Sequence, residues 1–261
     1  MTPGARISAT MEILDCYLRG GSEKKILLNW FRRNRFAGSK DRMAIRDFFF
    51  NCLTFKLSCQ WPFELAGVSV SGRTIALGML KLSGQCFDQI FDGRQYSPKK
   101  LSGLEINIIE NFDKALASAP TFVKLNFPQF LEKDLKDSFD IQFSENLTAL
   151  SEQASLFIRI NRLKSDYVSA IKSLRDDGID IEQQTNLNST LKVTENKGLI
   201  SKSKAYLSGK IEIQDINSQV VVDIVNPKKN TKILDFCAGS GGKTLAIASL
   251  TQGKAEFFVH D

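Results

Sequence analysis

Residues 231–244 carry the side chains and glycines with the clearest chemical meaning. They read Thr-Lys-Ile-Leu-Asp-Phe-Cys-Ala-Gly-Ser-Gly-Gly-Lys-Thr, which predicts a short apolar strand, a glycine-rich turn and a helix that begins near Lys243. Glycines at such a turn leave out the Cβ atoms that would block a cofactor, and the first N–H groups of the helix remain available as donors. The pattern predicts a binding turn for a nucleotide-like ligand.

The spacing of the glycines distinguishes three classes of ligand. A phosphate-binding P-loop needs glycine, four residues and then Gly-Lys-Thr, but Cys237 stands in place of the first glycine. A dinucleotide fingerprint needs a glycine three residues after Gly241, and that residue is Thr244. S-adenosylmethionine needs only close backbone approach and a carboxylate for its ribose, for which Asp261 is suitably placed after an apolar run. The spacing favours S-adenosylmethionine, and a P-loop-like nucleotide-binding enzyme remains the alternative.

Three stretches resemble motifs of the RsmB/Nop/Sun family of RNA cytosine-5 methyltransferases. Residues 235–244 resemble its cofactor motif, Asp-x-Cys-Ala-x-Pro-Gly-Gly-Lys-Thr, with Ser240 in place of the proline. Residues 157–164, Phe-Ile-Arg-Ile-Asn-Arg-Leu-Lys, are similar to its Arg-x-Asn-x-Leu-Lys strand, and residues 214–219 to its Gln-Asp-x-x-Ser-x helix entry. The resemblance covers residues 157–261 well and the amino-terminal part loosely.

The resemblance implies an S-adenosylmethionine-dependent enzyme that methylates RNA, in particular ribosomal RNA during its processing. The implied cofactor contacts are Cys237, Ala238, Gly239, Ser240, Gly241, Gly242, Lys243 and Asp261. Cytosine-5 methylation needs a cysteine thiolate that adds to the base and a second group that removes a proton. The family places its catalytic cysteines on later strands, so residues 1–261 are expected to hold no catalytic residue and to be inactive alone. Cys237 is therefore assigned to packing or cofactor contact.

The composition indicates a globular protein of the cytoplasm. Hydrophobic residues make up 43% of the 261 residues, and no apolar run reaches the roughly 18 residues that a membrane span needs. No secretion signal is recognisable at the amino terminus. The five cysteines form no C-x-x-C pair and His260 is the single histidine, which argues against a disulfide framework, a metal centre and a Ser-His hydrolase.

The excess of positive charge lies at the amino terminus. Residues 1–60 hold 11 Lys and Arg against 5 Asp and Glu, whereas residues 61–261 hold 24 of each. The basic residues around a turn at Gly38 are Arg32, Arg33, Arg35, Lys40, Arg42 and Arg46. Such a cluster suits the phosphates of RNA, and a solvated basic helical surface is the alternative. A non-catalytic RNA-binding protein that uses only these helices is a further alternative function.

The hydrophobic periodicity predicts a multidomain α and α/β chain with three regions. Residues 1–150 are expected to be helical, with a helix at 3–19 capped by Thr2, helices capped by Ser22 and by Ser39, and helices near 73–82, 102–117 and 128–138. Family members carry a helical RNA-binding domain in this region, so the resemblance implies one here.

The second and third regions alternate strands with helices. Residues 151–215 carry strands at 157–161, 190–194 and 210–213 and a helix capped by Ser165, which predicts a small α+β module with an antiparallel sheet. Residues 216–261 carry a helix at 215–226 and parallel strands at 232–236 and 256–260, the expected start of a doubly wound Rossmann-like domain. The resemblance implies a ferredoxin- or RRM-like module, in which Arg159, Asn161 and Lys164 would face RNA. Structural hydrogen bonds at a sheet edge are the alternative role for these three residues.

Overall fold

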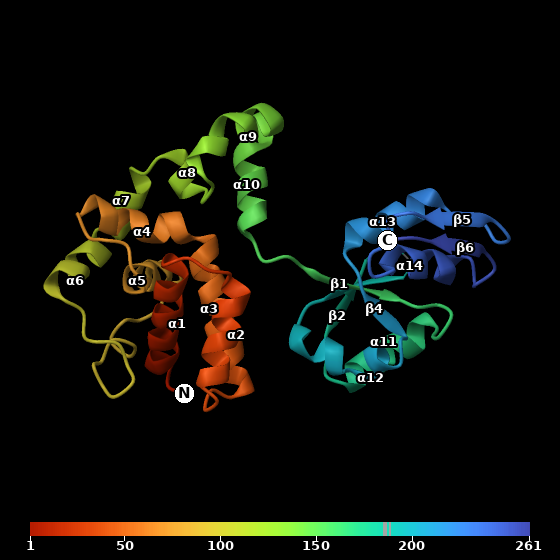
Figure 1. Ribbon diagram of the computed structural model, residues 1–261, viewed down its shortest axis with the longest axis horizontal. Helices are drawn as coiled ribbons and strands as arrows, with labels where there is room; N and C mark the ends of the chain where they lie inside the picture. Colours follow the sequence, from red (N-terminus) through yellow and green to blue (C-terminus); the bar gives the residue numbers. More distant parts are fainter. Residues whose placement is uncertain (185–186, 188) are drawn as a thin grey trace. The chain divides into compact units, whose positions relative to one another are not determined.

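The computed structural model describes residues 1–184, 187 and 189–261 (Figure 1). The chain divides into two compact units, Met1–Gln153 and Ala154–Asp261, called here the helical unit and the mixed unit. Among the described residues, no helix combines the length and the apolar character that crossing a membrane requires.

The helical unit consists of helices, most of them joined by short turns, with a longer loop at 83–102 between α5 and α6 (Figure 1). They are α1 (Pro3–Leu18), α2 (Glu23–Arg33), α3 (Ser39–Thr54), α4 (Lys56–Leu65), α5 (Gly72–Leu82), α6 (Gly103–Glu110), α7 (Phe112–Ala117), α8 (Thr121–Lys124), α9 (Glu132–Phe139) and α10 (Phe143–Ser151), with 3-10 turns η1 (Gln129–Leu131) and η2 (Asp140–Gln142). The hydroxyl of Thr2 accepts a hydrogen bond from the backbone N–H of Ala5 at 3.1 Å and so caps α1, as the sequence predicted.

Two predicted caps in the helical unit are wrong in detail. Ser22 precedes α2, but its side chain makes no capping hydrogen bond. Ser39 is the first residue of α3 and not its cap, because the backbone turns into the helix at Gly38. The backbone N–H of Gly38 donates to the carboxylate of Asp41 at 3.3 Å, so an acidic side chain in the first turn satisfies a group that the helix leaves free.

The core of the helical unit lies between α1, α3, α4 and α5. Its fully buried side chains include Leu14, Ile45, Phe49, Phe63 and Leu77, whose removal from water stabilises the unit. Helices α4 and α5 approach closely because α5 carries Gly78. A Cβ atom at that position would lie 2.4 Å from the backbone oxygen of Cys59, so only glycine permits this helix contact.

The mixed unit begins with a four-stranded sheet whose strands run in the order β2-β3-β1-β4. The strands are β1 (Leu156–Ile160), β2 (Ile181–Gln183), β3 (Thr190–Val193) and β4 (Ile211–Ile213), accompanied by α11 (Tyr167–Asp176), η3 (Lys197–Lys202) and α12 (Lys204–Leu207). Neighbouring strands pair antiparallel, as predicted. Asp166, not Ser165, caps α11, because its carboxylate accepts a hydrogen bond from the N–H of Ser169 at 2.8 Å.

A second sheet follows in the same unit, preceded by α13 (Ile216–Val225). Strands β5 (Lys232–Asp235) and β6 (Glu256–Val259) pair in parallel, and α14 (Gly242–Leu250) connects them. The helices α13 and α14 lie together beside this pair (Figure 1) and bury Val222, Ala246 and Ile247. Leu234 and Phe258 remain exposed, because among the described residues one layer of helices covers the two strands.

Candidate cofactor turn and basic surface

The glycine-rich turn connects the end of β5 to the start of α14. Gly239 and Gly241 have φ angles of +56° and +82°, a backbone region that L-residues enter only at a cost. A Cβ atom at either position would meet no atom within 4 Å. The two glycines are therefore required by the path of the backbone, and the space beside them is open to a ligand.

The end of β6 closes over the same turn. The carboxylate of Asp261 accepts a hydrogen bond from the N–H of Gly239 at 3.0 Å, and the carbonyl of His260 accepts one from the N–H of Ala238 at 3.0 Å. On the other side, the hydroxyl of Thr244 donates to the carboxylate of Asp235 at 2.6 Å. The structure thus brings the predicted carboxylate, Asp261, against the predicted turn.

The other predicted cofactor residues lie along this turn at different depths. Cys237, Ser240 and Lys243 are exposed, whereas Ala238, Gly241 and Gly242 are half-buried. The imidazole of His260 stacks on the ring of Phe236 with 4.9 Å between the centroids and 9° between the planes. This stacked pair is a feature of the site that sequence reasoning missed, since no spacing rule pairs residues on neighbouring parallel strands.

The basic residues around Gly38 fall into two groups. Arg32, Arg33, Arg35 and Lys40 are exposed, and no hydrogen bond or ion pair to their side chains occurs among the described residues. Arg42 instead donates to the carbonyl of Ala37 at 2.8 Å, and its guanidinium lies 5.5 Å from the ring centre of Phe31. Arg46 is exposed and forms an ion pair with Asp47. The structure leaves the first four cations available to phosphates and uses Arg42 to hold the turn.

Arg159 corrects a prediction from the sequence. It is only 5% exposed, its Nε donates to the side-chain oxygen of Gln214 at 2.7 Å, and it forms an ion pair with Glu212. The ion pair follows from the strand register, because Arg159 on β1 lies directly opposite Glu212 on β4. Burial lowers the pKa of the Arg159 guanidinium, and the Glu212 carboxylate opposes that shift. Arg159 therefore holds two strands together and does not face RNA.

Asn161 and Lys164 differ from Arg159 in their surroundings. The side chain of Asn161 is half-buried and donates to the carbonyl of Gly209 at 3.1 Å, while its oxygen accepts from the N–H of Leu163 at 3.1 Å. These contacts give Asn161 a structural role in the turn after β1. Lys164 is exposed, with its ammonium 3.4 Å from the carbonyl of Ser208, so it is still accessible to a phosphate.

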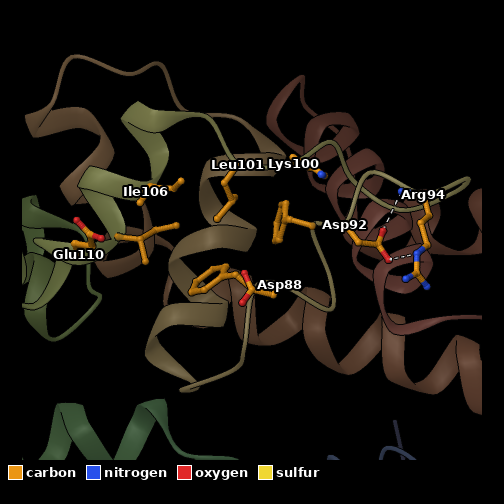
Figure 2. A pocket seen from close by; sticks show the side chains of 10 residues that line it. Asp88, Asp92, Arg94, Lys100, Leu101, Ile106 and Glu110 are labelled. Atoms are coloured by element: carbon orange, nitrogen blue, oxygen red, sulfur yellow. Dashed lines mark hydrogen bonds and ion pairs between the residues drawn. The ribbon is translucent and has the colours of Figure 1, made fainter.

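A cavity of about 710 Å³ in the helical unit is a different kind of site (Figure 2). Its lining combines apolar side chains such as Leu101 and Ile106 with the carboxylates of Asp88, Asp92 and Glu110 (Figure 2). Arg94 forms an ion pair with Asp92, with 3.4 Å between its Nε and the carboxylate oxygen Oδ2. Because carboxylates outnumber free cations around this cavity, it is poorly suited to an RNA backbone.

Comparison with known proteins identifies relatives of this chain. The family description "Methyltr_RsmF/B-like, ferredoxin-like domain" matches residues 127–198, a stretch that includes β1, α11, β2 and β3. The probable ribosomal RNA small subunit methyltransferase B of Bacillus subtilis is 27% identical over 128 residues, which are 49% of this chain and 28% of that protein. The protein of the same name from Synechocystis is 29% identical over 137 residues, or 52% of this chain and 31% of that one.

A solved structure supports the arrangement of the fold. The crystal structure of PH0851 matches with a TM-score of 0.63 and 18% sequence identity, and the match covers 100% of this chain and 64% of that one. At this identity the match concerns the fold alone. The aligned part of this chain corresponds to less than one third of the two curated relatives, whose covered shares are 28% and 31%.

Proposed function

We propose that this chain, which matches the RsmF/B-like family model over residues 127–198 and resembles ribosomal RNA small subunit methyltransferases B, is part of an S-adenosylmethionine-dependent enzyme that methylates cytosine at carbon 5 in ribosomal RNA. The observation that carries the proposal is the turn at 236–241. Its two glycines with positive φ leave open space beside the backbone, and the Asp261 carboxylate lies at its edge. This geometry suits a cofactor that needs backbone approach and a ribose acceptor, and supports the cofactor assignment.

Each part of the turn has a defined task under this proposal. One oxygen of Asp261 is held by the N–H of Gly239, and the second oxygen accepts no hydrogen bond among the described residues, so it is available to a ribose hydroxyl. The Asp235–Thr244 hydrogen bond fixes the strand end against the first turn of α14. Cys237, Ser240 and Lys243 lie around the opening as further cofactor contacts. No residue of 1–261 is assigned as the nucleophile.

Under this proposal, RNA binding and cofactor binding are divided among the three regions. Residues 1–150 would bind RNA through the exposed cations Arg32, Arg33, Arg35 and Lys40, residues 151–215 would add Lys164, and residues 216–261 would hold the cofactor. We propose that the β5–β6 pair belongs to a Rossmann-like sheet. In such a sheet, exposed apolar side chains like Leu234 and Phe258 are covered by further strands and helices.

Calorimetric titration of the chain with S-adenosylmethionine, and separately with ATP and Mg²⁺, tests the assignment of the turn. We expect binding of S-adenosylmethionine and none of ATP, because Cys237 removes the first glycine of a phosphate loop. Binding of ATP alone would instead support the P-loop alternative. If the chain binds RNA but binds neither S-adenosylmethionine nor ATP, a non-catalytic RNA-binding protein is the best description.

A further inference from the structure

A second cavity of the helical unit, of about 690 Å³, lies between α1, the end of α2 and the loop that contains Tyr96. Its lining combines three aromatic side chains, Trp30, Phe36 and Tyr96, with polar ones that include Glu12, Asn34 and Gln95. We call it the Trp30 cavity. Its position at the end of α2 places it directly beside the segment that carries the free arginines.

Two of the aromatic rings of the Trp30 cavity are largely in water. Phe36 is 70% exposed and Tyr96 is 74% exposed, whereas Trp30 is buried and meets Phe36 edge to face at 6.4 Å. Leaving large rings in solvent forgoes the stabilisation that their burial would give. Tyr96 also has a φ of +69°, a conformation that costs a non-glycine residue free energy. The exposure of these rings and the backbone conformation of Tyr96 therefore lower the stability of the fold, and no packing contact within the unit accounts for them.

The polar groups of the Trp30 cavity are held in place with acceptors left over. The indole N–H of Trp30 donates to one carboxylate oxygen of Glu12 at 3.0 Å, and the amide of Asn34 donates to the carbonyl of Trp30 at 2.9 Å. The second oxygen of Glu12 and the side-chain oxygen of Asn34 accept nothing else among the described residues. Fixed acceptors beside aromatic rings can receive the N–H groups of a nucleobase edge.

Free positive charge adjoins this aromatic cavity. Arg33 precedes Asn34 and Arg35 lies between Asn34 and Phe36, and both arginines are exposed with no carboxylate partner among the described residues. The cavity of Figure 2 differs, because Asp88, Asp92 and Glu110 line it together with Arg94, which pairs with Asp92, and Lys100. Aromatic rings next to unpaired arginines are the combination that binds single-stranded nucleic acid.

We propose that the Trp30 cavity holds one unpaired base of a single-stranded RNA segment, stacked against Phe36 and Tyr96, while Arg33 and Arg35 contact the adjoining phosphates. This site rests on the proposed function only in taking RNA as the ligand. A base held in a duplex cannot enter the cavity, because stacking on a side chain requires that the base first leave its neighbours. The site therefore selects unpaired RNA.

Tryptophan fluorescence reports on the cavity when Trp30 is the single tryptophan. Because the chain has two tryptophans, the Trp61→Phe variant leaves only Trp30. The substitution removes no hydrogen bond, since the indole N–H of Trp61 has no partner among the described residues. We expect a short single-stranded oligoadenylate to quench Trp30 and a duplex RNA of equal length to leave it unchanged. Equal quenching by the duplex would overturn the proposal.

Variants separate the base from the phosphates. Phe36→Ala and Tyr96→Gly should each weaken oligoadenylate binding about 5- to 150-fold without changing its salt dependence. Tyr96→Gly should not lower stability, because glycine accepts the positive φ. Changing Arg33 and Arg35 together to Gln should reduce the salt slope by about 0.7 for each phosphate that the variant no longer neutralises. Phe130→Ala, which removes an 81% exposed ring outside the cavity, is the matched control.

The outcomes distinguish this site from the broader function. Unchanged binding in Phe36→Ala and Tyr96→Gly, with weaker binding in the double arginine variant, would overturn the base site and leave RNA recognition by phosphates intact. Equal weakening by Phe130→Ala would also overturn it. Absence of any RNA binding by the unaltered chain would overturn both this site and the RNA part of the proposed function.

Discussion

Replacement of Gly241 by alanine tests the cofactor turn with a change of one methyl group. Gly241 precedes α14 with a φ of +82°, where a non-glycine residue costs roughly 1–2 kcal/mol. The added Cβ meets no protein atom within 4 Å, so no clash adds to this cost. We expect the free energy of unfolding of the mixed unit to fall by about 1–2 kcal/mol and its fold to persist.

The effect on cofactor affinity has a separate cause. A methyl group placed where the cofactor approaches the backbone must be accommodated by displacement, and overpacking of this kind typically costs about 1–3 kcal/mol. Each 1.4 kcal/mol is about a tenfold change in the dissociation constant. Gly241→Ala should therefore weaken S-adenosylmethionine binding about 5- to 150-fold.

A matched control separates these two effects. Gly253 lies beyond the other end of α14 with a φ of +69°, and the nearest atom to its added Cβ is a methyl carbon of Leu163 at 4.0 Å. Gly253→Ala should lose about the same stability and keep full affinity for S-adenosylmethionine. Urea unfolding measures the first quantity and calorimetric titration the second. Equal cofactor affinity in the two variants would show that the ligand does not approach the turn at Gly241.

Two further predictions concern the ion pairs of each unit. Arg159→Met should destabilise the mixed unit by about 3 kcal/mol in urea unfolding, because it leaves the Glu212 carboxylate without its partner, and an unchanged midpoint would contradict the structural role of Arg159. In the helical unit, burial acts to raise the pKa of Glu105, but the hydrogen bonds from Arg73 and from Ser102 lower it overall below its usual value of 4.5. A carboxyl group whose pKa is lowered in the folded state stabilises the fold at pH values above its unfolded-state pKa, and this stabilisation is lost as the pH falls through the folded-state pKa. In the Arg73→Met variant the free energy of unfolding should therefore depend less on pH between about pH 5 and pH 3 than in the unaltered chain.

The sequence predicts those elements whose signals are local. Thr2 followed by Pro3 defines the start of α1, and alternating residues around 158 and 192 define antiparallel strands. Caps are less certain because neighbouring polar residues compete for the same role, as Ser165 and Asp166 do before α11. Asp166 caps because an ionised carboxylate is a stronger acceptor for a backbone N–H than a hydroxyl is.

The burial and the contacts of a side chain depend on residues that are remote in the sequence. Arg159 lies in a motif that suggests RNA contact, yet its role is decided by Glu212, which is separated from it by 53 positions. Only the register of β1 with β4 places the two residues opposite each other. A basic residue at alternating spacing in a strand is therefore weak evidence for a ligand until the opposing strand is known. The exposed Arg33 and Arg35 have no such partner among the described residues, and this supports their assignment to RNA.

The motifs at 157–164 and 214–219 contact each other, and Gln214 also lies beside the cofactor turn, because a Cβ atom on Gly242 would lie 3.6 Å from its side-chain nitrogen. The side chain of Gln214 accepts from Arg159 at 2.7 Å, and its backbone carbonyl accepts from the side chain of Gln219 at 3.0 Å. Gln219 in turn accepts from the hydroxyl of Thr190 at 2.6 Å, so β1, β3 and the start of α13 share one buried network. Removing one member of such a network leaves buried polar groups of its neighbours unpaired, so the members depend on one another. Since α13 packs on α14, the network fixes the antiparallel sheet against the helix whose first turn forms the cofactor site.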